Sequence, residues 1–128
     1  IDGRDIWPLM SGQPGAKSPH DALYFYWGRE LQAIRSGRWK LHLPHDYRSL
    51  ASGGGHGGLP SKYEQRRIDL SLFDLENDPG ESKNVAAEHP DEVKRLLTLA
   101  DRARDDLGDT ATGQKGKHAR PAGQLRQE

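Results

Sequence analysis

The chain has 128 residues, and its 19 basic and 19 acidic side chains give a formal net charge of zero. This balance excludes a module that binds nucleic acid or a membrane surface mainly through net charge. The absence of cysteine excludes a disulfide framework and a thiolate nucleophile. Because only 33% of the residues are hydrophobic, we expect one modest domain with a small core and substantial loops.

Residues 1–21 predict a lead-in segment with one helical turn. An Asp-Gly turn signal is followed by a short apolar stretch with Trp7, Leu9 and Met10, and the segment ends in a Gly/Pro/Ser loop. These apolar residues belong to no long periodic element, so we expect them to pack against a neighbouring surface. No apolar run is long enough to span a bilayer, and the missing initiator methionine indicates a piece of a longer protein.

Residues 22–43 predict a three-stranded antiparallel meander and contain most of the aromatic residues. The three β-type runs are 22–27, 30–35 and 38–43, separated by Gly-Arg and Ser-Gly breaks. Alternation places Leu23, Phe25 and Trp27 on one face of the first strand and the tyrosines at 24 and 26 on the other. Since neither face is purely polar, the sheet requires cover on both sides.

Residues 44–67 predict a long loop, because the glycine run at 53–58 makes a regular element improbable. Loops of this length are usually functional or disordered. The loop concentrates polar and aromatic side chains: His45, Asp46, Tyr47, Arg48, His56, Lys62 and Tyr63. Lys40 and His42 on the preceding strand would form a cationic rim toward an anionic substrate, or would simply be solvated. His42 and His45 lack further ligands for a metal site.

Residues 68–75 predict a fourth strand that pairs with the meander, and 78–81 suit a type II turn with glycine at its third position. An amphipathic helix follows from Pro90, which fits the first helical position, to Gly108, which fits the C-terminal cap. Its apolar stripe comprises Val93, Leu96, Leu97, Ala100, Ala103 and Leu107. The division is therefore 1–108 as the folded unit and 109–128 as an extended tail, disordered or docked elsewhere.

No local catalytic motif is present, since the chain lacks GxSxG, a phosphate-binding loop, HExxH and an EF-hand loop. Four segments nevertheless resemble the C-terminal subdomain of bacterial arylsulfatases, the formylglycine-dependent type I sulfatases. They are IDGRDIWPLMSG, the segment from ALYFYWGRE to PHDYRSL, the segment from YEQRRIDLSLFDLENDPGE to DEVKRL, and GKHARPAG. The resemblance implies an α+β fold, a small antiparallel sheet of about four strands packed by one C-terminal helix.

The same resemblance implies that this subdomain packs on a large N-terminal α/β catalytic domain of the same polypeptide. In such enzymes a C/S-x-P-x-R motif yields the formylglycine that attacks the sulfate ester, and carboxylates hold a calcium ion. This sequence has no such motif, so we expect the nucleophile, formylglycine and calcium in the missing domain. The resemblance further implies a periplasmic or secreted sulfuric ester hydrolase, with His45, Tyr47, Arg48 and His56 facing the substrate.

Two alternatives from other classes remain open at this point. One is a free-standing carbohydrate-binding module, in which Tyr24, Tyr26, Trp27 and Trp39 form an aromatic platform. The other is a protein-interaction domain that docks through the same sheet face.

Overall fold

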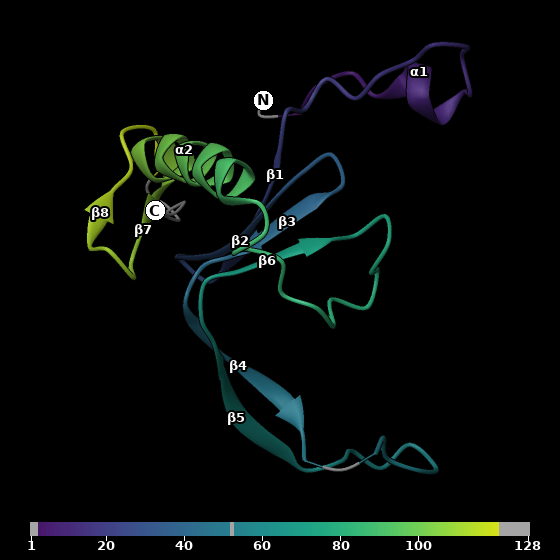
Figure 1. Ribbon diagram of the computed structural model, residues 1–128, viewed down its shortest axis with the longest axis vertical. Coiled ribbons are helices and arrows are strands. Elements are labelled where there is room, and N and C mark those ends of the chain that lie inside the picture. The colour runs from purple at the N-terminus through teal and green to yellow at the C-terminus, as the bar shows by residue number, and fades with distance from the viewer. Residues whose placement is uncertain (1–2, 52, 121–128) are drawn as a thin grey trace, which may run out of the picture.

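The structure is a computed structural model that describes residues 3–51 and 53–120. Its centre is a four-stranded antiparallel sheet in the order β1-β2-β3-β6 (Figure 1). The bounds are Leu23–Trp27 for β1, Glu30–Ser36 for β2, Trp39–His42 for β3 and Ser71–Asp74 for β6. The predicted α+β class, the meander and the pairing of the fourth strand with it are confirmed.

Helix α2, Pro90–Leu107, lies across one face of this sheet (Figure 1). Pro90 occupies the first turn, together with Asp91 and Glu92, whose negative charges favour that end of the helix dipole. The core forms where a row of paired sheet residues, Ile34, Leu41 and Leu72, meets the helix. The buried helix residues are Leu96, Leu99, Ala100 and Ala103.

The predicted apolar stripe of α2 needs one correction. Leu99, which is not part of the predicted stripe, is 8% exposed, whereas Leu107, which is part of it, is 52% exposed. Residues 96, 99, 100 and 103 follow the 3-4 spacing of a helix face. Leu107 continues that spacing, but it is the last helical residue and is not part of the hydrophobic core.

The second face of the sheet is only partly covered. Leu23, Phe25 and Trp27 on β1 are 52%, 42% and 72% exposed, and a register irregularity separates Phe25 from Tyr26. Tyr26 packs against the core, and its hydroxyl donates to the Gly108 carbonyl over 3.0 Å. An exposed apolar surface therefore remains at β1, and the expectation that this face is covered by another domain stays a prediction.

The prediction of a long loop at 44–67 is wrong. His45–Leu50 forms β4 and Tyr63–Ile68 forms β5, and these strands pair over six residues as a separate antiparallel ribbon that extends away from the sheet (Figure 1). Both strands are polar on both faces, so they lack the apolar alternation that identifies a strand in sequence. Among the described residues of this range, the glycine run at 53–58 lies outside the two strands. Ile68 consequently ends β5, and the fourth strand of the sheet starts at Ser71.

A second projection consists of the lead-in segment, which leaves the body as an arm with α1, Trp7–Met10, near its end (Figure 1). Trp7 and Met10 are 63% and 71% exposed, so the predicted contact of these residues with a neighbouring surface stays a prediction. Within 3–51 and 53–120, no helix is long and apolar enough to cross a membrane.

The segment after Gly108 is not extended where it is described. β7, Gly108–Asp109, pairs with β8, Gln114–Lys115, and this hairpin returns to α2. The backbone amides of Lys117 and His118 donate to the carbonyls of Asp105 and Asp106 over 2.9 Å. Residues 109–118 thus pack on α2 of the same subdomain. Polar contacts hold them there, and a pattern of hydrophobic residues in the sequence cannot predict such contacts. The rest of the predicted tail, 121–128, lies outside the described residues.

Candidate functional site

The four residues predicted to face a substrate lie along the ribbon rather than in one site. His45 begins β4 and is 6% exposed, and its Nδ1–H donates to the Leu43 carbonyl over 2.7 Å. Its ring stacks on His42 with 5.5 Å between centroids. His45 is therefore a packing residue at the base of the ribbon, while His56 lies in the 51–62 loop at its far end.

Tyr47 and Arg48 are adjacent in β4 and so point to opposite faces of the ribbon. The Tyr47 ring lies edge-on to His45, 6.3 Å between centroids. The Arg48 guanidinium instead lies over the ring of Tyr63, 4.4 Å from its centroid. The sequence places Tyr63 only among the polar and aromatic residues of a predicted loop, because its contact with Arg48 depends on the pairing of β4 with β5.

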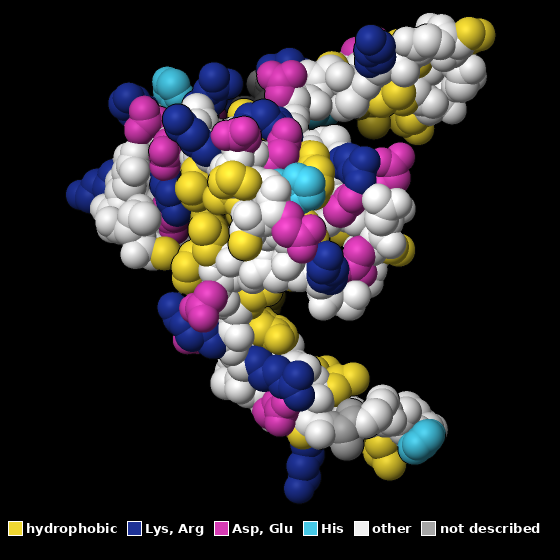
Figure 2. All heavy atoms as spheres, viewed as in Figure 1, with side chains coloured by type: hydrophobic (Ala, Val, Ile, Leu, Met, Phe, Trp, Pro, Cys, Tyr) yellow, Lys and Arg dark blue, Asp and Glu magenta, His cyan; other side chains and the backbone are white. Residues whose placement is uncertain are grey.

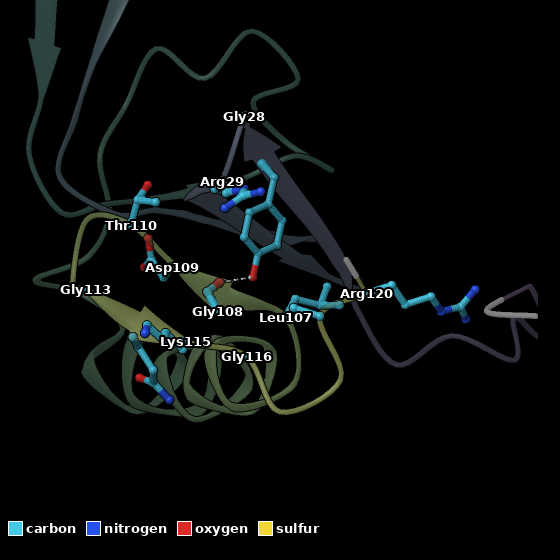
Figure 3. Close-up of a pocket in the computed structure, with 13 residues that line it drawn as sticks. Gly28, Arg29, Leu107, Gly108, Asp109, Thr110, Gly113, Lys115, Gly116 and Arg120 are labelled. Atoms are coloured by element: carbon cyan, nitrogen blue, oxygen red, sulfur yellow. Dashed lines mark hydrogen bonds between the residues drawn. The ribbon is translucent and has the colours of Figure 1, made fainter. Parts of the chain in front are cut away.

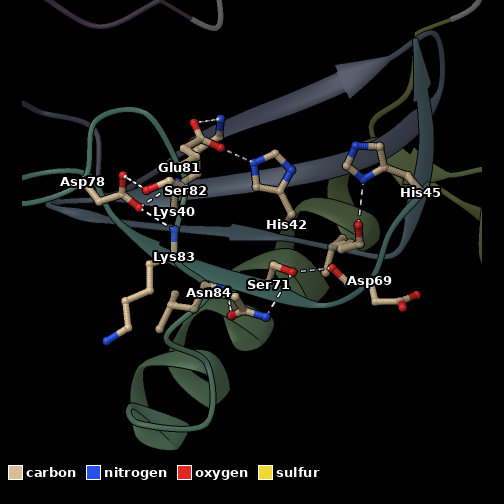
Figure 4. A network of polar contacts seen from close by, with 12 residues as sticks. Lys40, His42, His45, Asp69, Ser71, Asp78, Glu81, Ser82, Lys83 and Asn84 are labelled. Atoms are coloured by element: carbon tan, nitrogen blue, oxygen red, sulfur yellow. Dashed lines mark hydrogen bonds and ion pairs between the residues drawn. The ribbon is translucent and has the colours of Figure 1, made fainter. Parts of the chain in front are cut away.

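Lys40 and His42 do not form a free cationic rim, because Glu81 binds both of them (Figure 4). The Lys40 ammonium donates to Oε1 of Glu81 over 2.6 Å, and Nε2–H of His42 donates to Oε2 over 2.7 Å. All three side chains are less than a third exposed. We call these residues the Glu81 cluster. Lys40 and His42 lie on β3, whereas the exposed apolar side chains of the sheet's second face, Leu23, Phe25 and Trp27, lie on β1.

Burial lowers the pKa of His42, and the positive charge of Lys40 acts in the same direction, against the opposing effect of Glu81. For Glu81, burial would raise the pKa, but hydrogen bonds from Lys40 and His42 outweigh it and the pKa is lowered. Nδ1 of His42 is buried and has no partner within the described residues. The cluster therefore contains the Glu81 carboxylate, the Lys40 ammonium and the neutral imidazole of His42, whose unprotonated Nδ1 is buried.

The turn that carries Glu81 is built by Asp74 and Asp78. Asp74 accepts from Arg38 and Asn77, and the hydrogen bond from Arg38 is the main cause that lowers its pKa. Asp78 accepts from the backbone amides of Ser82 and Lys83. The amide of Glu81 donates to the Asp78 carbonyl over 3.2 Å, so the predicted turn exists.

The predicted type II geometry of this turn is wrong. Type II requires a positive φ at Gly80, yet the positive φ, 53°, falls on Glu81. A left-handed backbone costs a non-glycine residue about 1 kcal/mol or more. The Glu81 carboxylate forms an ion pair with Lys40 and accepts a hydrogen bond from His42, and these contacts, which sequence reasoning missed, stabilise the turn.

A second polar group lies where α2 ends. The Asp109 carboxylate is fully buried and accepts from Nε of Arg104, at 2.9 Å, and from the backbone amides of Leu31 and Ala111. It joins α2, β2 and the β7–β8 hairpin beside a hollow of about 810 Å³ (Figure 3). The hollow is lined by Tyr26, Arg29, Leu107, Thr110 and Lys115, with backbone from the glycines at 28, 108, 113 and 116.

The sequence and the described residues can be compared with the nucleophile and metal centre that the family resemblance implies. The sequence has no cysteine and no C/S-x-P-x-R motif. Among the described residues, no group of three or more His, Asp or Glu side chains is placed to hold a metal ion. The location of formylglycine and calcium in a catalytic domain therefore stays a prediction.

The aromatic platform of the carbohydrate-module alternative does not form. Tyr26 and Trp39 pack against the core, and the Trp39 ring lies 4.7 Å from that of His89. Trp27 is 72% exposed at the end of β1. These side chains therefore present no common flat surface.

The fold and these contacts define a small α+β subdomain with structural polar clusters, two projections and an apolar sheet edge. Residues 18–124 match the family model described as the C-terminal region of aryl-sulfatase. This chain belongs to that family.

Curated relatives agree with this assignment. The chain is 34% identical to arylsulfatase A of Bos taurus over 116 residues, which cover 77% of this chain and 22% of that protein. It is 30% identical to arylsulfatase A of Homo sapiens, covering 77% and 21%, and 31% identical to the steryl-sulfatase of Mus musculus, covering 80% and 18%. The chain thus spans about a fifth of the length of these relatives. The predicted family is confirmed, and its bacterial origin stays a prediction.

Proposed function

We propose that this chain is the C-terminal subdomain of a sulfuric ester hydrolase and packs on an N-terminal α/β catalytic domain of the same polypeptide. One observation supports the packing role directly: the sheet is covered by α2 on one face, while Leu23, Phe25 and Trp27 remain exposed on the other. Burying such side chains contributes about 1.5–3 kcal/mol each. Trp7 and Met10 on the arm add a second apolar contact to the same proposal.

In this proposal the catalytic domain supplies the nucleophile, the formylglycine and the calcium ion, and this chain is inactive by itself. The absence of suitable donors among its described residues supports that division. The substrate is a sulfate ester, with neither nucleic acid nor a membrane as a partner, and the enzyme acts in the periplasm or outside the cell. The compartment rests on the family resemblance alone.

The test is to express the longer reading frame, with its formylglycine-generating partner, and to assay an aryl sulfate with and without residues 1–128. We expect turnover that is lost when this segment is deleted. Separately purified catalytic domain and 1–128 should associate, and Phe25→Glu with Trp27→Glu should abolish that association. Turnover by 1–128 alone, or association unaffected by the double substitution, would contradict the proposal.

A further inference from the structure

Strand β1 forms one edge of the four-stranded sheet, with β2 as its single neighbour among the described strands. Along such a strand, alternate residues direct their backbone N–H and C=O groups toward the free edge, where another strand can pair with them. Soluble proteins usually block a free edge with a lysine, a proline or another charged side chain. β1 has the sequence LYFYW and contains none of these residues.

The opposite edge of the sheet, formed by β6, is closed by the chain itself. The Leu72 amide donates to Oδ1 of Asn84 over 3.0 Å, and the Leu72 carbonyl accepts from the Val85 amide over 2.9 Å. Among the described residues, no segment outside β2 makes a backbone hydrogen bond to β1. The fold therefore covers one edge of the sheet and leaves the other open.

The sequence around β1 is complementary to itself in the antiparallel direction. When two copies of the strand pair with Phe25 opposite Phe25, Leu23 lies opposite Trp27 and Tyr24 lies opposite Tyr26. Residues that lie opposite each other are on the same face of the joined sheet, and aromatic cross-strand pairs stabilise such a pairing. No charged side chain within β1 opposes a like charge.

The residues that flank β1 carry opposite charges in the same register. Asp21 lies opposite Arg29 of the second copy, and the two-fold symmetry forms this pair twice. Both side chains are exposed, and neither makes an ion pair within the described part of the chain. A register shifted by two residues would lose both pairs, so the charges favour the arrangement centred on Phe25.

The rest of the surface does not oppose the approach of a second copy. The formal net charge is zero, and Figure 2 shows acidic and basic side chains interspersed over the visible face of the body. Two copies therefore meet without net electrostatic repulsion.

We propose that β1 pairs with β1 of a second copy of this chain and joins the two sheets into one continuous antiparallel sheet, with a two-fold axis at Phe25. The axis is perpendicular to the sheet, so the α2 helices of both copies lie on the same face. Leu23, Phe25 and Trp27 of both copies form one apolar surface on the other face. The proposal uses the edge of β1 and leaves that surface available for the packing proposed above.

The experiment measures the dimer dissociation constant of the 128-residue chain by sedimentation equilibrium. Asp21→Arg and Arg29→Asp each place like charges opposite each other twice, so each should raise the Kd by about tenfold. An equimolar mixture of the two variants should recover the wild-type Kd within about threefold. In the mixed dimer, the two arginines of the first variant face the two aspartates of the second. Lys62→Asp, an equal charge reversal at an exposed residue before β5, is the control and should leave the Kd within about twofold.

Cross-linking tests the register directly, since the chain contains no cysteine. Phe25→Cys places the new thiol opposite its own copy, where Cα atoms of paired residues are about 4.5–5.5 Å apart, within reach of a disulfide. Mild oxidation should therefore link this variant into dimers. The matched variant Leu23→Cys lies on the same face but opposite Trp27, so it should cross-link at least about tenfold more slowly.

Three results would overturn the proposal: a wild-type chain that stays monomeric at every concentration, a mixture that does not recover the wild-type Kd, or equal cross-linking at positions 23 and 25. A monomeric chain would assign the open edge to a strand of another domain. Each of these results leaves the proposed function intact, because that function is tested separately by association of 1–128 with the catalytic domain and by turnover.

Discussion

At the scale of single residues, the polar groups near the sheet stabilise the fold rather than serve chemistry. Glu81 neutralises Lys40 and fixes the tautomer of His42, because its carboxylate can only accept hydrogen bonds. The motif DPGE after LFDL signalled a turn, yet nothing in the sequence indicated that its last residue reaches back to the third strand. The sequence therefore predicts a cationic rim at Lys40 and His42 that Glu81 binds in the fold, while the substrate-facing role of His45, Tyr47, Arg48 and His56 stays a prediction.

A pH dependence of stability follows from His42. Its pKa is lowered in the folded chain, so the unfolded chain binds more protons as the pH falls below about 6.5, the usual value for histidine. Stability should be constant above that pH and decrease as the pH falls toward the lower folded pKa. The groups that face His42 are Lys40, Glu81 and His45.

The measurement is urea denaturation between pH 4.5 and 8. In this window Glu81, whose pKa is lowered below its usual 4.5, remains ionised in the folded chain. His42→Gln should flatten the decrease below pH 6.5, and His56→Gln, in the exposed loop, should leave it unchanged. A profile that is the same for both variants would show that His42 is not its cause.

At the scale of elements, α2 and the hairpin after it act as one unit. The helix supplies the apolar half of the core, and Asp109 ties its C-terminal end to β2 through hydrogen bonds to Arg104 and the Leu31 amide. Apolar periodicity predicted the helix correctly because a single face is buried. It could not predict the hairpin, whose strands are two residues long and depend on polar contacts.

The corrected stripe of α2 predicts different costs for two leucines. Leu99→Ala removes a buried side chain and should lower the free energy of unfolding by about 2–5 kcal/mol. Leu107→Ala removes a half-exposed one and should cost less than about 1 kcal/mol. Urea denaturation of both variants at pH 7 measures the two losses in the free energy of unfolding. Equal losses would mean that the stripe expected from sequence is the correct one.

Asp109→Asn should destabilise the chain by about 3 kcal/mol, because it leaves the Arg104 guanidinium without its buried carboxylate. The β7–β8 amides should also exchange faster with solvent. The matched control is Asp101→Asn, which removes the 72% exposed partner of the same arginine and should cost less than about 1 kcal/mol. Comparable losses in both variants would argue against the role of Asp109 as the tie between elements.

At the scale of the whole molecule, the body is small and two projections leave it, the arm with α1 and the β4–β5 ribbon (Figure 1). A chain with this much exposed apolar surface on its arm and its β1 strand suits a partner domain better than isolation. The ribbon is different in character, since its Arg48 guanidinium lies over the exposed ring of Tyr63.

The isolated chain should therefore associate with itself as its concentration rises. Trp27→Ser with Phe25→Thr removes large apolar side chains from an exposed strand face, and this pair should shift sedimentation toward the monomer without loss of stability. Arg35→Gln, an exposed polar change on β2, serves as the control. A wild-type chain that stays monomeric at high concentration would contradict an apolar docking face.

The sequence by itself determined the elements whose signal is local: the meander with its glycine turns, the helix from Pro90, and the short motifs that place the chain in its family. Local periodicity suffices there because each element buries one apolar face. Four features became visible only in the tertiary structure: the β4–β5 ribbon, the Glu81 cluster, the hydrogen bonds of Asp109, and the contact of Arg48 with the Tyr63 ring. These depend on polar contacts between residues distant in sequence, and such contacts exist only once the register and the packing are fixed.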